Sequence, residues 1–288
     1  MKNVLVRLEE YLPRASEAER GAIKWLMQSP ESAVDLSIQQ LAGRTFTSAS
    51  TIIRLCRKLG FDGYKEFHKA LLYELAVRRE ASDEQTREID RADTLEAIAQ
   101  KVTYRNILSL ENTNKLLNME VLSTCLELID AADNLIFFGM GASLLIARDA
   151  CLKFVRVNKS CYFGDDWHMQ LLHAKNSTER DVVIAISYSG VTMETIKCAE
   201  IAKKNGTPVI AITRFEPSKL VKLADYSLYV ATIELFSRMG AMSSRIAQSN
   251  IIDILYSAYV NKNYDTCVPK IIRTHFSKKT DGAGDIEP

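Results

Sequence analysis

Small hydroxyl side chains gather directly after one apolar run of the sequence. Residues 182–186 are apolar at every position and mostly β-branched, which is typical of a central parallel strand buried on both faces. The run ends in Ser187, Ser189, Gly190 and Thr192, where the strand should turn into a helix. Hydroxyl groups and the unpaired N–H groups of a helix start would converge there, and such a point suits a phosphate.

A second loop, residues 139–143, contains two glycines, and we compared both loops with known glycine-rich motifs. The third glycine of a dinucleotide fingerprint would fall at Leu144, and the acidic residues 165–166 lie beyond the roughly 20-residue offset of a ribose contact. The first loop has Ile186 where a nucleophile elbow needs glycine, and it has no lysine before Thr192 for a Walker loop. We therefore expect a phosphate cradle of N–H and O–H donors, with no cofactor.

Five short apolar runs, separated by helical patterns, must position these loops. A series of this kind predicts a doubly wound α/β fold, an αβα sandwich with a mostly parallel five-stranded sheet. Ligands then bind beyond the carboxyl ends of the strands, where both loops lie. The expected strands are residues 134–138, 160–163, 182–186, 208–212 and 226–230.

The first 80 residues favour an all-helical domain with helix-turn-helix spacing. After a short break at residues 43–47, a third helix should run over residues 48–59, with Thr47 as its N-cap and Gly60 as its stop. Two earlier helices begin at capping boxes, Ser16 with Glu19 and Ser37 with Gln40.

The third helix has one apolar arc and one polar arc. Between Leu36 and Phe61 the chain carries four cations and no carboxylate, so the free face of the helix is basic although the whole chain is not. Contacts with nucleic-acid phosphates need this charge pattern. The alternative is an ordinary amphipathic helix whose solvated side is basic. The capped helices and the tight turn favour DNA binding.

Residues 36–42 and 50–67 resemble the N-terminal helix-turn-helix of the RpiR family of bacterial transcription regulators. The turn at residues 44–46 departs from the small residue and valine usual in such turns. Arg54 is our candidate for a base-edge contact, because a guanidinium can meet guanine in a bidentate way. The resemblance implies that the major groove is faced by Ser48, Ser50, Thr51, Arg54 and Lys58, with Arg57 and Lys65 nearer the phosphates.

The two loops of the α/β half are similar to those of the SIS (sugar isomerase) domain, which is the second half of RpiR regulators. Residues 234–238, 242–248 and 253–256 strengthen this likeness, which spans residue 16 to about residue 260. The alternative is a pair of tight turns that use small residues for packing alone. The resemblance implies a phosphate site made of Ser187, Ser189, Gly190 and Thr192, with Gly141 and Ser143 opposite. Glu234, which precedes Arg238 near the last helix, is a candidate sugar ligand, and it could equally abstract a proton.

Composition and turn signals predict the domain limits and the cellular compartment of the chain. We expect a helix-turn-helix domain over residues 1–79, a polar linker over 80–93, an SIS domain over 94–265 and a tail over 266–288. At 288 residues with 47% hydrophobic side chains and a net charge of +1, the chain has room for two cores and no global field. Six scattered cysteines fit a reducing cytoplasm, and we expect neither a signal peptide nor a membrane span.

Two functional hypotheses follow. The first is a transcription regulator, not an enzyme, whose SIS domain senses a phosphorylated sugar, an amino-sugar phosphate among the candidates. It would bind a double-stranded DNA operator as a homodimer or homotetramer. The second is a sugar-phosphate isomerase with an appended helical module, which needs a general base. The candidates for that base are His168, His173, Glu194 and Glu234, and each has a structural alternative; a metal held by residues 165–168 would lack ligands.

Overall fold

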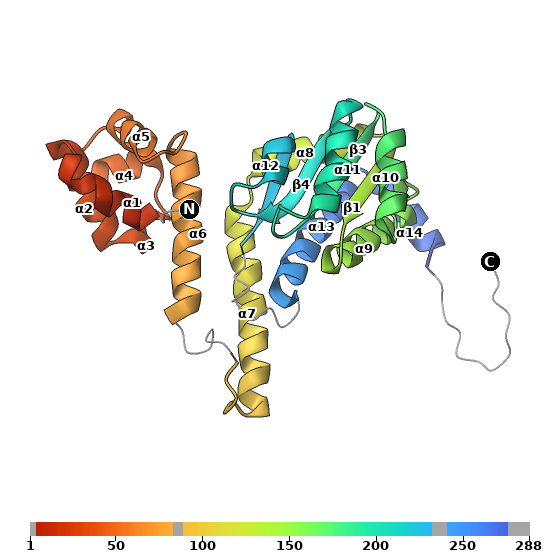
Figure 1. The fold of residues 1–288 in the computed structure, drawn as a ribbon, viewed down its shortest axis with the longest axis horizontal. Helices are drawn as coiled ribbons and strands as arrows, with labels where there is room; N and C mark the ends of the chain where they lie inside the picture. The colour runs from red at the N-terminus through yellow and green to blue at the C-terminus, as the bar shows by residue number, and fades with distance from the viewer. Residues whose placement is uncertain (1–3, 83–88, 232–240, 276–288) are drawn as a thin grey trace.

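The computed structural model describes residues 4–82, 89–231 and 241–275, which form a helical unit and an α/β unit (Figure 1). The helical unit has one apolar core, which includes Ile23, Leu41, Ile52 and Phe67. Its helices are α1 (Val4–Tyr11), the 3-10 turn Leu12–Arg14, α2 (Glu17–Gln28), α3 (Pro30–Ala33), α4 (Ile38–Arg44), α5 (Ala49–Lys58) and α6 (Tyr64–Ser82).

The turn between α4 and α5 differs from the expected one at its cap. Ser48, not Thr47, is the N-cap of α5, and its Oγ accepts a hydrogen bond from the Thr51 N–H at 3.1 Å. Thr47 is unsuited because its hydroxyl pairs with that of Thr45 at 3.0 Å. Phe46 has a φ of +54° and a 97% exposed side chain. Both predicted capping boxes are present, and Gly60 ends α5 with a φ of +84°, as expected.

The α/β unit contains a five-stranded sheet in the order β2-β1-β3-β4-β5, and all its pairings are parallel. The predicted doubly wound fold is confirmed. The strands are β1 (Asn134–Gly139), β2 (Ser160–Tyr162), β3 (Asp181–Ile186), β4 (Val209–Arg214) and β5 (Tyr226–Val230). The helices are α7 (Leu95–Leu116), α8 (Met119–Ala131), α9 (Ala142–Arg156), α10 (Trp167–Asn176), α11 (Met193–Lys204), α12 (Lys219–Leu223), α13 (Met242–Lys262) and α14 (Tyr264–Arg273).

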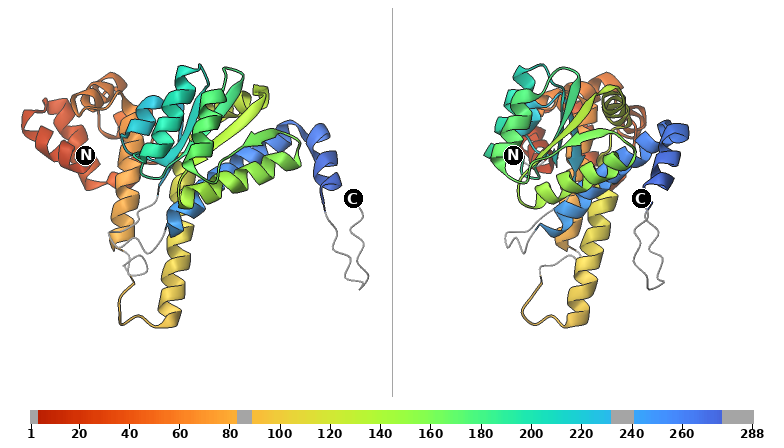
Figure 2. Two further views of the ribbon diagram at one scale, coloured as in Figure 1. Left: turned by 45° about the vertical axis from the view of Figure 1, so that its right-hand side comes forward. Right: turned by 90° about the vertical axis from the view of Figure 1, so that its right-hand side faces the viewer.

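Helices cover both faces of this sheet. One face packs against α8, α9 and α13, and the other packs against α10, α11 and α12. β3 is buried along its whole length, as expected for a strand that contacts helices on both sides. The N-terminal part of α7 projects away from the sheet (Figure 2). No helix among the described residues is long and apolar enough to cross a membrane, and all six cysteines are free thiols.

The two units meet along α6. Leu72 of α6 packs with Leu116 of α7 and with Ala231, just after β5. The ring centroid of Tyr73 lies 6.1 Å from that of Phe215, which follows β4 directly. Beyond this contact, α6 continues to Ser82 and α14 ends at Arg273.

Candidate functional site

The two glycine- and serine-containing loops lie side by side at the carboxyl edge of the sheet. β1 and β3 are neighbours, and their register pairs Gly139 with Ile186, so both strands end at the same level. The loop at residues 187–192 leads into α11, and the loop at residues 140–141 leads into α9. The sheet therefore brings the two predicted halves of the site together.

The loop after β3 is a compact hydroxyl cluster. Ser187 is 2% exposed, and its Oγ lies 3.0 Å from Oγ1 of Thr192. The bend between them requires glycine, because Gly190 has a φ of +65° and an added Cβ would lie 2.2 Å from Oγ of Ser218. Oγ of Ser189 accepts a hydrogen bond from the Val191 N–H at 3.4 Å. These contacts hold three hydroxyls around one helix start.

The helices that begin at these loops lack side-chain caps. The N-cap of α11 is Thr192, whose hydroxyl accepts no bond from the first turn, and the N-cap of α9 is Gly141, which has no side chain to do so. By contrast, Asp166 caps α10 by accepting from the Met169 N–H at 2.9 Å. First-turn N–H groups carry partial positive charge and are suited to an anion. At the start of α9 the N–H groups of Ser143 and Leu144 donate to backbone carbonyls at 3.2 and 3.1 Å, so α11 offers the freer set of donors.

Two glutamines that the sequence did not single out support the loop after β1. Gln170 of α10 is buried, donates to the Gly139 carbonyl at 2.9 Å and accepts from the Gly139 N–H at 3.2 Å. Ser143 is 8% exposed, and its hydroxyl donates to Oε1 of Gln248 on α13 at 3.4 Å. No spacing rule predicts such contacts, since residues 143 and 248 are 105 positions apart.

Arg214, at the end of β4, joins the cradle to the boundary between the units. Its N–H donates to the Tyr188 carbonyl at 3.1 Å, and its guanidinium lies 5.7 Å from the centroid of the Tyr188 ring. The next residue, Phe215, contacts both Tyr73 of α6 and Tyr229, whose ring centroid is 4.9 Å away at an edge-to-face angle of 89°. The loop after β3 is therefore bonded to Arg214, and the residue after Arg214 contacts α6.

Three of the four candidate general bases of the isomerase hypothesis lie in a ring contact or in the first turn of a helix. The His173 ring lies 5.2 Å from that of Tyr162, on the edge strand β2, and burial lowers the pKa of His173. His168 is exposed in the first turn of α10, and Glu194 lies in the first turn of α11, where it complements the helix dipole. Glu234 lies outside the described residues.

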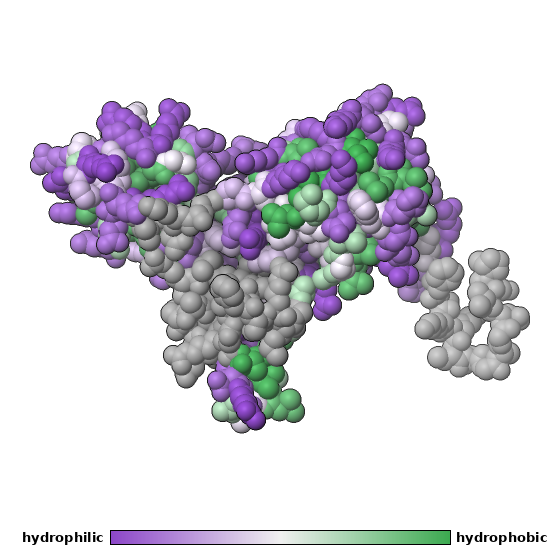
Figure 3. Space-filling model, viewed as in Figure 1, coloured by the Kyte–Doolittle hydropathy of each residue, from purple (hydrophilic) through white to green (hydrophobic). Residues whose placement is uncertain are grey.

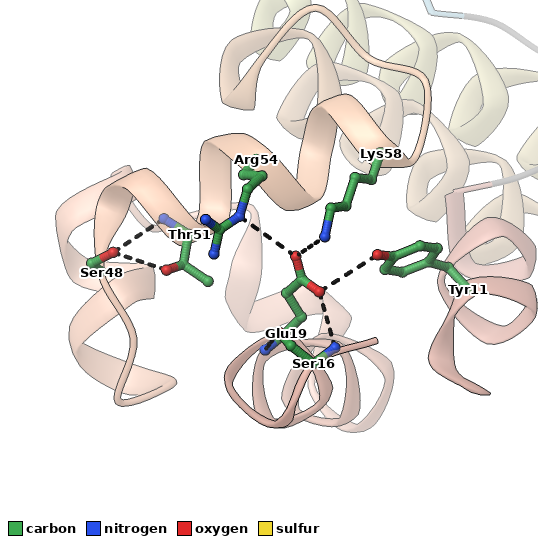
Figure 4. Close-up of polar contacts among 7 residues, drawn as sticks. All are labelled: Tyr11, Ser16, Glu19, Ser48, Thr51, Arg54 and Lys58. Carbon is green, nitrogen blue, oxygen red and sulfur yellow. Dashed lines mark hydrogen bonds and ion pairs between the residues drawn. The ribbon is translucent and has the colours of Figure 1, made fainter. Parts of the chain in front are cut away.

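Two cations of α5 lie against a buried carboxylate that belongs to another helix. Glu19, on α2, is buried, and its Oε1 lies 2.7 Å from Lys58 Nζ and 3.8 Å from Arg54 Nε (Figure 4). Burial raises the pKa of the Glu19 carboxyl, but hydrogen bonds from Lys58 and Ser16 outweigh burial and lower the pKa to about 2. Glu19 is therefore charged, and Lys58 points at it.

The other predicted DNA-contacting residues have varied surroundings. Ser50 is exposed, and the Arg54 side chain is 63% exposed despite its contact with Glu19. Ser48 and Thr51 bond to each other through their hydroxyls at 2.9 Å. Arg57 is exposed and lines a cleft between the units together with Phe215. Lys65 forms an exposed ion pair with Glu120 of α8 at 2.7 Å.

Comparison with known proteins identifies both units. The family model described as a helix-turn-helix domain of the rpiR family matches residues 2–78, and the SIS domain model matches residues 127–258. An uncharacterised HTH-type transcriptional regulator of Caldanaerobacter subterraneus is 36% identical over 93% of this chain and 94% of its own length. The chain belongs to the rpiR family of HTH-type transcriptional regulators. The predicted family, both domain types and the regulatory function are confirmed.

Solved structures agree with this assignment. The Vibrio vulnificus NanR protein complexed with ManNAc-6P is 26% identical, with a TM-score of 0.59 over 94% of this chain and 96% of that chain. The sugar isomerase domain of an RpiR transcription factor from Sphaerobacter thermophilus shares the fold, with 19% identity and a TM-score of 0.54 over 61% of this chain and 97% of that chain.

Proposed function

We propose that this regulator binds a phosphorylated sugar in its SIS domain and that this ligand changes its affinity for an operator. The hydroxyl cluster of Ser187 and Thr192 beside two uncapped helix starts carries the proposal, because these groups supply donors and partial positive charge without a lysine. The similarity to NanR, which was solved with ManNAc-6P, supports an amino-sugar phosphate as the first ligand to test.

The roles of the individual residues follow from their donors. Ser187, Ser189 and Thr192 hold the phosphate together with the first N–H groups of α11, while Gly190 makes the bend. Gly141 and Ser143 close the site from the loop after β1. Glu234 is proposed to accept from a sugar hydroxyl. We propose that the domain binds its ligand without turnover, since the HTH-type relatives are named as regulators.

On the DNA side, we assign the operator-binding domain to residues 1–79, the linker to residues 80–93 and the effector domain to residues 94–265. Arg54 reads a base edge, because its exposed guanidinium can offer two parallel donors. Ser48, Ser50 and Thr51 approach the major groove from the start of α5. Arg57, Lys58 and Lys65 contact phosphates, and Lys58 exchanges the Glu19 carboxylate for a phosphate when it does so.

The Arg214 and Phe215 segment is proposed to transmit ligand binding to the operator domain. A phosphate that draws the loop at residues 187–190 inward pulls the Tyr188 carbonyl, to which the Arg214 N–H is bonded. Phe215 then shifts against Tyr73 of α6, and α6 shares its core with α5. A typical coupling of about 1–3 kcal/mol changes DNA affinity roughly 5- to 150-fold.

We propose a symmetric homodimer, or a homotetramer built from it, so that two recognition helices meet a palindromic operator. Exposed apolar side chains support this. They gather over α9 and α10 and at the projecting end of α7 (Figure 3), and they include Leu152, Val155, Leu172 and Leu95. Light scattering of the purified protein tests this assembly, and a monomer at micromolar concentration contradicts it.

A thermal-shift screen of sugars with and without phosphate tests the effector. At 100 times its dissociation constant, a ligand adds about 2.7 kcal/mol of stability. We expect a response to the phosphate ester and none to the free sugar; equal responses refute the phosphate cradle. If the wild type turns over a sugar phosphate and Glu234→Gln does not, the proposal of binding without turnover is refuted.

An Arg54→Ala variant tests the operator domain separately. It should lose specific binding to a DNA site selected from random sequences, because no other exposed guanidinium lies at the centre of α5. Its response to the sugar phosphate should stay unchanged. Loss of both properties together would refute the division of labour between the two domains.

A further inference from the structure

Phe46, in the turn between α4 and α5, is unfavourable for the free protein in two ways. Its backbone φ of +54° is left-handed, a conformation that crowds the Cβ of a bulky residue against its own chain. Its side chain is 97% exposed, and Leu95 follows at 84% among the large apolar side chains of the described residues. Single exposed apolar residues are ordinary, but strained backbone at a bulky residue is characteristic of functional sites. The combination at one position indicates a function for the ring.

The turn holds Phe46 in a fixed position. Thr45 is buried, and its hydroxyl donates to the Leu41 carbonyl at 2.8 Å. The same hydroxyl lies 3.0 Å from that of Thr47, whose N–H donates to the Ala42 carbonyl at 2.9 Å. The residues on either side of Phe46 are therefore tied to the end of α4, and the ring is presented to solvent by an ordered backbone.

The position of this turn relative to DNA follows from the family. In a helix-turn-helix the first helix crosses the DNA backbone, and the second lies in the major groove and contacts base edges with its N-terminal residues. Here these helices are α4 and α5, within the matched residues 2–78. Phe46 lies two residues after Arg44, the exposed last residue of α4, and two before Ser48, the N-cap of α5. This places Phe46 at the edge of the groove.

The chemistry of the ring limits what it can recognise there. Phenylalanine has neither a donor nor an acceptor, so it cannot read the polar atoms of a base edge. The major groove also presents one apolar group, the C5 methyl of thymine, and phenylalanine is a side chain suited to contact it. Because the hydrogen bonds of the turn already order its backbone, such a contact needs little further ordering.

We infer that Phe46 is a specificity-determining residue that packs its ring against the methyl group of a thymine at the edge of each half-site. The inference rests on the proposed recognition role of α5 and adds to it a residue outside that helix. It also accounts for the strain, since a left-handed turn residue that serves DNA recognition need not be the most stable choice for the free protein.

The test removes the methyl group from the DNA and the ring from the protein. A DNA site is selected from random sequences with the wild-type protein, and each of its thymines is replaced in turn by deoxyuridine, which lacks only the methyl. Fluorescence anisotropy measures binding of the full-length protein. At one position of each half-site, we expect the replacement to weaken wild-type binding about 4-fold, the size of one buried methyl group.

Phe46→Asn should bind the thymine and deoxyuridine forms of the DNA equally at that position. Asparagine tolerates the left-handed backbone, so the variant keeps the turn, and its urea unfolding curve confirms that it is folded. The matched control is Phe46→Leu, which keeps an apolar side chain on the same backbone and should keep a preference for thymine.

The outcomes separate this inference from the recognition role of α5. A Phe46→Asn protein with the full thymine preference, or a wild type that is insensitive to every replacement, overturns the inference. The role of α5 stands in that case if Arg54→Ala loses specific binding. If Arg54→Ala binds the selected site as the wild type does, the role of α5 fails and the inference with it. A Phe46→Asn protein with unchanged DNA binding but a smaller assembly in light scattering also overturns it, because the ring would then contact protein.

Discussion

Replacing Glu19 by Gln should destabilise the helical unit at neutral pH. The change keeps the capping box, because glutamine also accepts from the Ser16 N–H, which Glu19 binds at 3.0 Å. It removes the charge that Lys58 and Arg54 share. Lowering the carboxyl pKa from 4.5 to about 2 corresponds to about 3 kcal/mol in favour of the charged form. Solvent screens the partly exposed cations, so we expect a loss of about 2 kcal/mol.

The difference between wild type and variant should depend on pH in one direction. The Glu19 pKa is lower in the folded state than in the unfolded chain, so its contribution is fully present above pH 4.5. It decreases as the pH falls from 4.5 towards about 2, where the folded carboxyl takes up its proton. The two proteins should therefore have equal stabilities near pH 2 and differ most at neutral pH.

Urea unfolding followed by Trp25 fluorescence measures this effect. Trp25 lies on α2, within the helical unit, and the chain's other tryptophan, Trp167, can be replaced by phenylalanine in both proteins. Glu17→Gln, an exposed first-turn acid on the same helix, is the matched control and should cost less than about 0.5 kcal/mol. A Glu19→Gln protein as stable as the wild type at pH 7, or a difference that grows on acidification, refutes the reasoning.

Three further substitutions probe the turns and the boundary between the units. Gly190→Ala should weaken sugar-phosphate binding more than about 10-fold in a titration, since its Cβ would meet Ser218 in a left-handed bend. The control is Gly206→Ala, which should bind normally, because Gly206 is also left-handed but its added Cβ would have its nearest contact at 3.6 Å. Phe46→Asn should stabilise the helical unit by about 0.5–1 kcal/mol in urea, because asparagine tolerates the left-handed backbone; a loss of stability contradicts this. Phe215→Ala should bind DNA and sugar phosphate yet lose most of the coupling between them in fluorescence anisotropy, and intact coupling excludes this route.

The sequence predicts the elements of this fold well and its long-range contacts poorly. The five strands agree with prediction within two residues at their ends, because uninterrupted apolar runs between helical patterns have few other solutions. The α5 cap was predicted one residue early, since Thr47 and Ser48 are both good N-caps and only the Thr45 contact decides between them. The sequence does predict that the two loops lie side by side, because each directly follows a buried strand of a parallel sheet.

The residues that sequence reasoning missed act across the fold. The interval between Leu36 and Phe61 has no carboxylate, yet folding brings Glu19 of α2 against α5. The same holds for Gln248, whose partner Ser143 is remote in sequence. Glu19 did carry a signal, since it occupies the third position of a capping box and a buried acid there needs a cation nearby. No pattern in α5 alone predicts that partner.

The pairing of Lys58 with Glu19 also affects how many ions leave the protein–DNA interface. Each phosphate neutralised by a protein cation releases condensed counterions, which gives a slope of about −0.9 per contact when the logarithm of affinity is plotted against the logarithm of salt concentration. The complex that forms while Lys58 still holds Glu19 makes one such contact fewer than the cations of α5 suggest. We proposed that Lys58 leaves Glu19 for a phosphate in the operator complex, and this exchange adds one phosphate contact. The salt slope should therefore be steeper for the operator than for random DNA by about one contact.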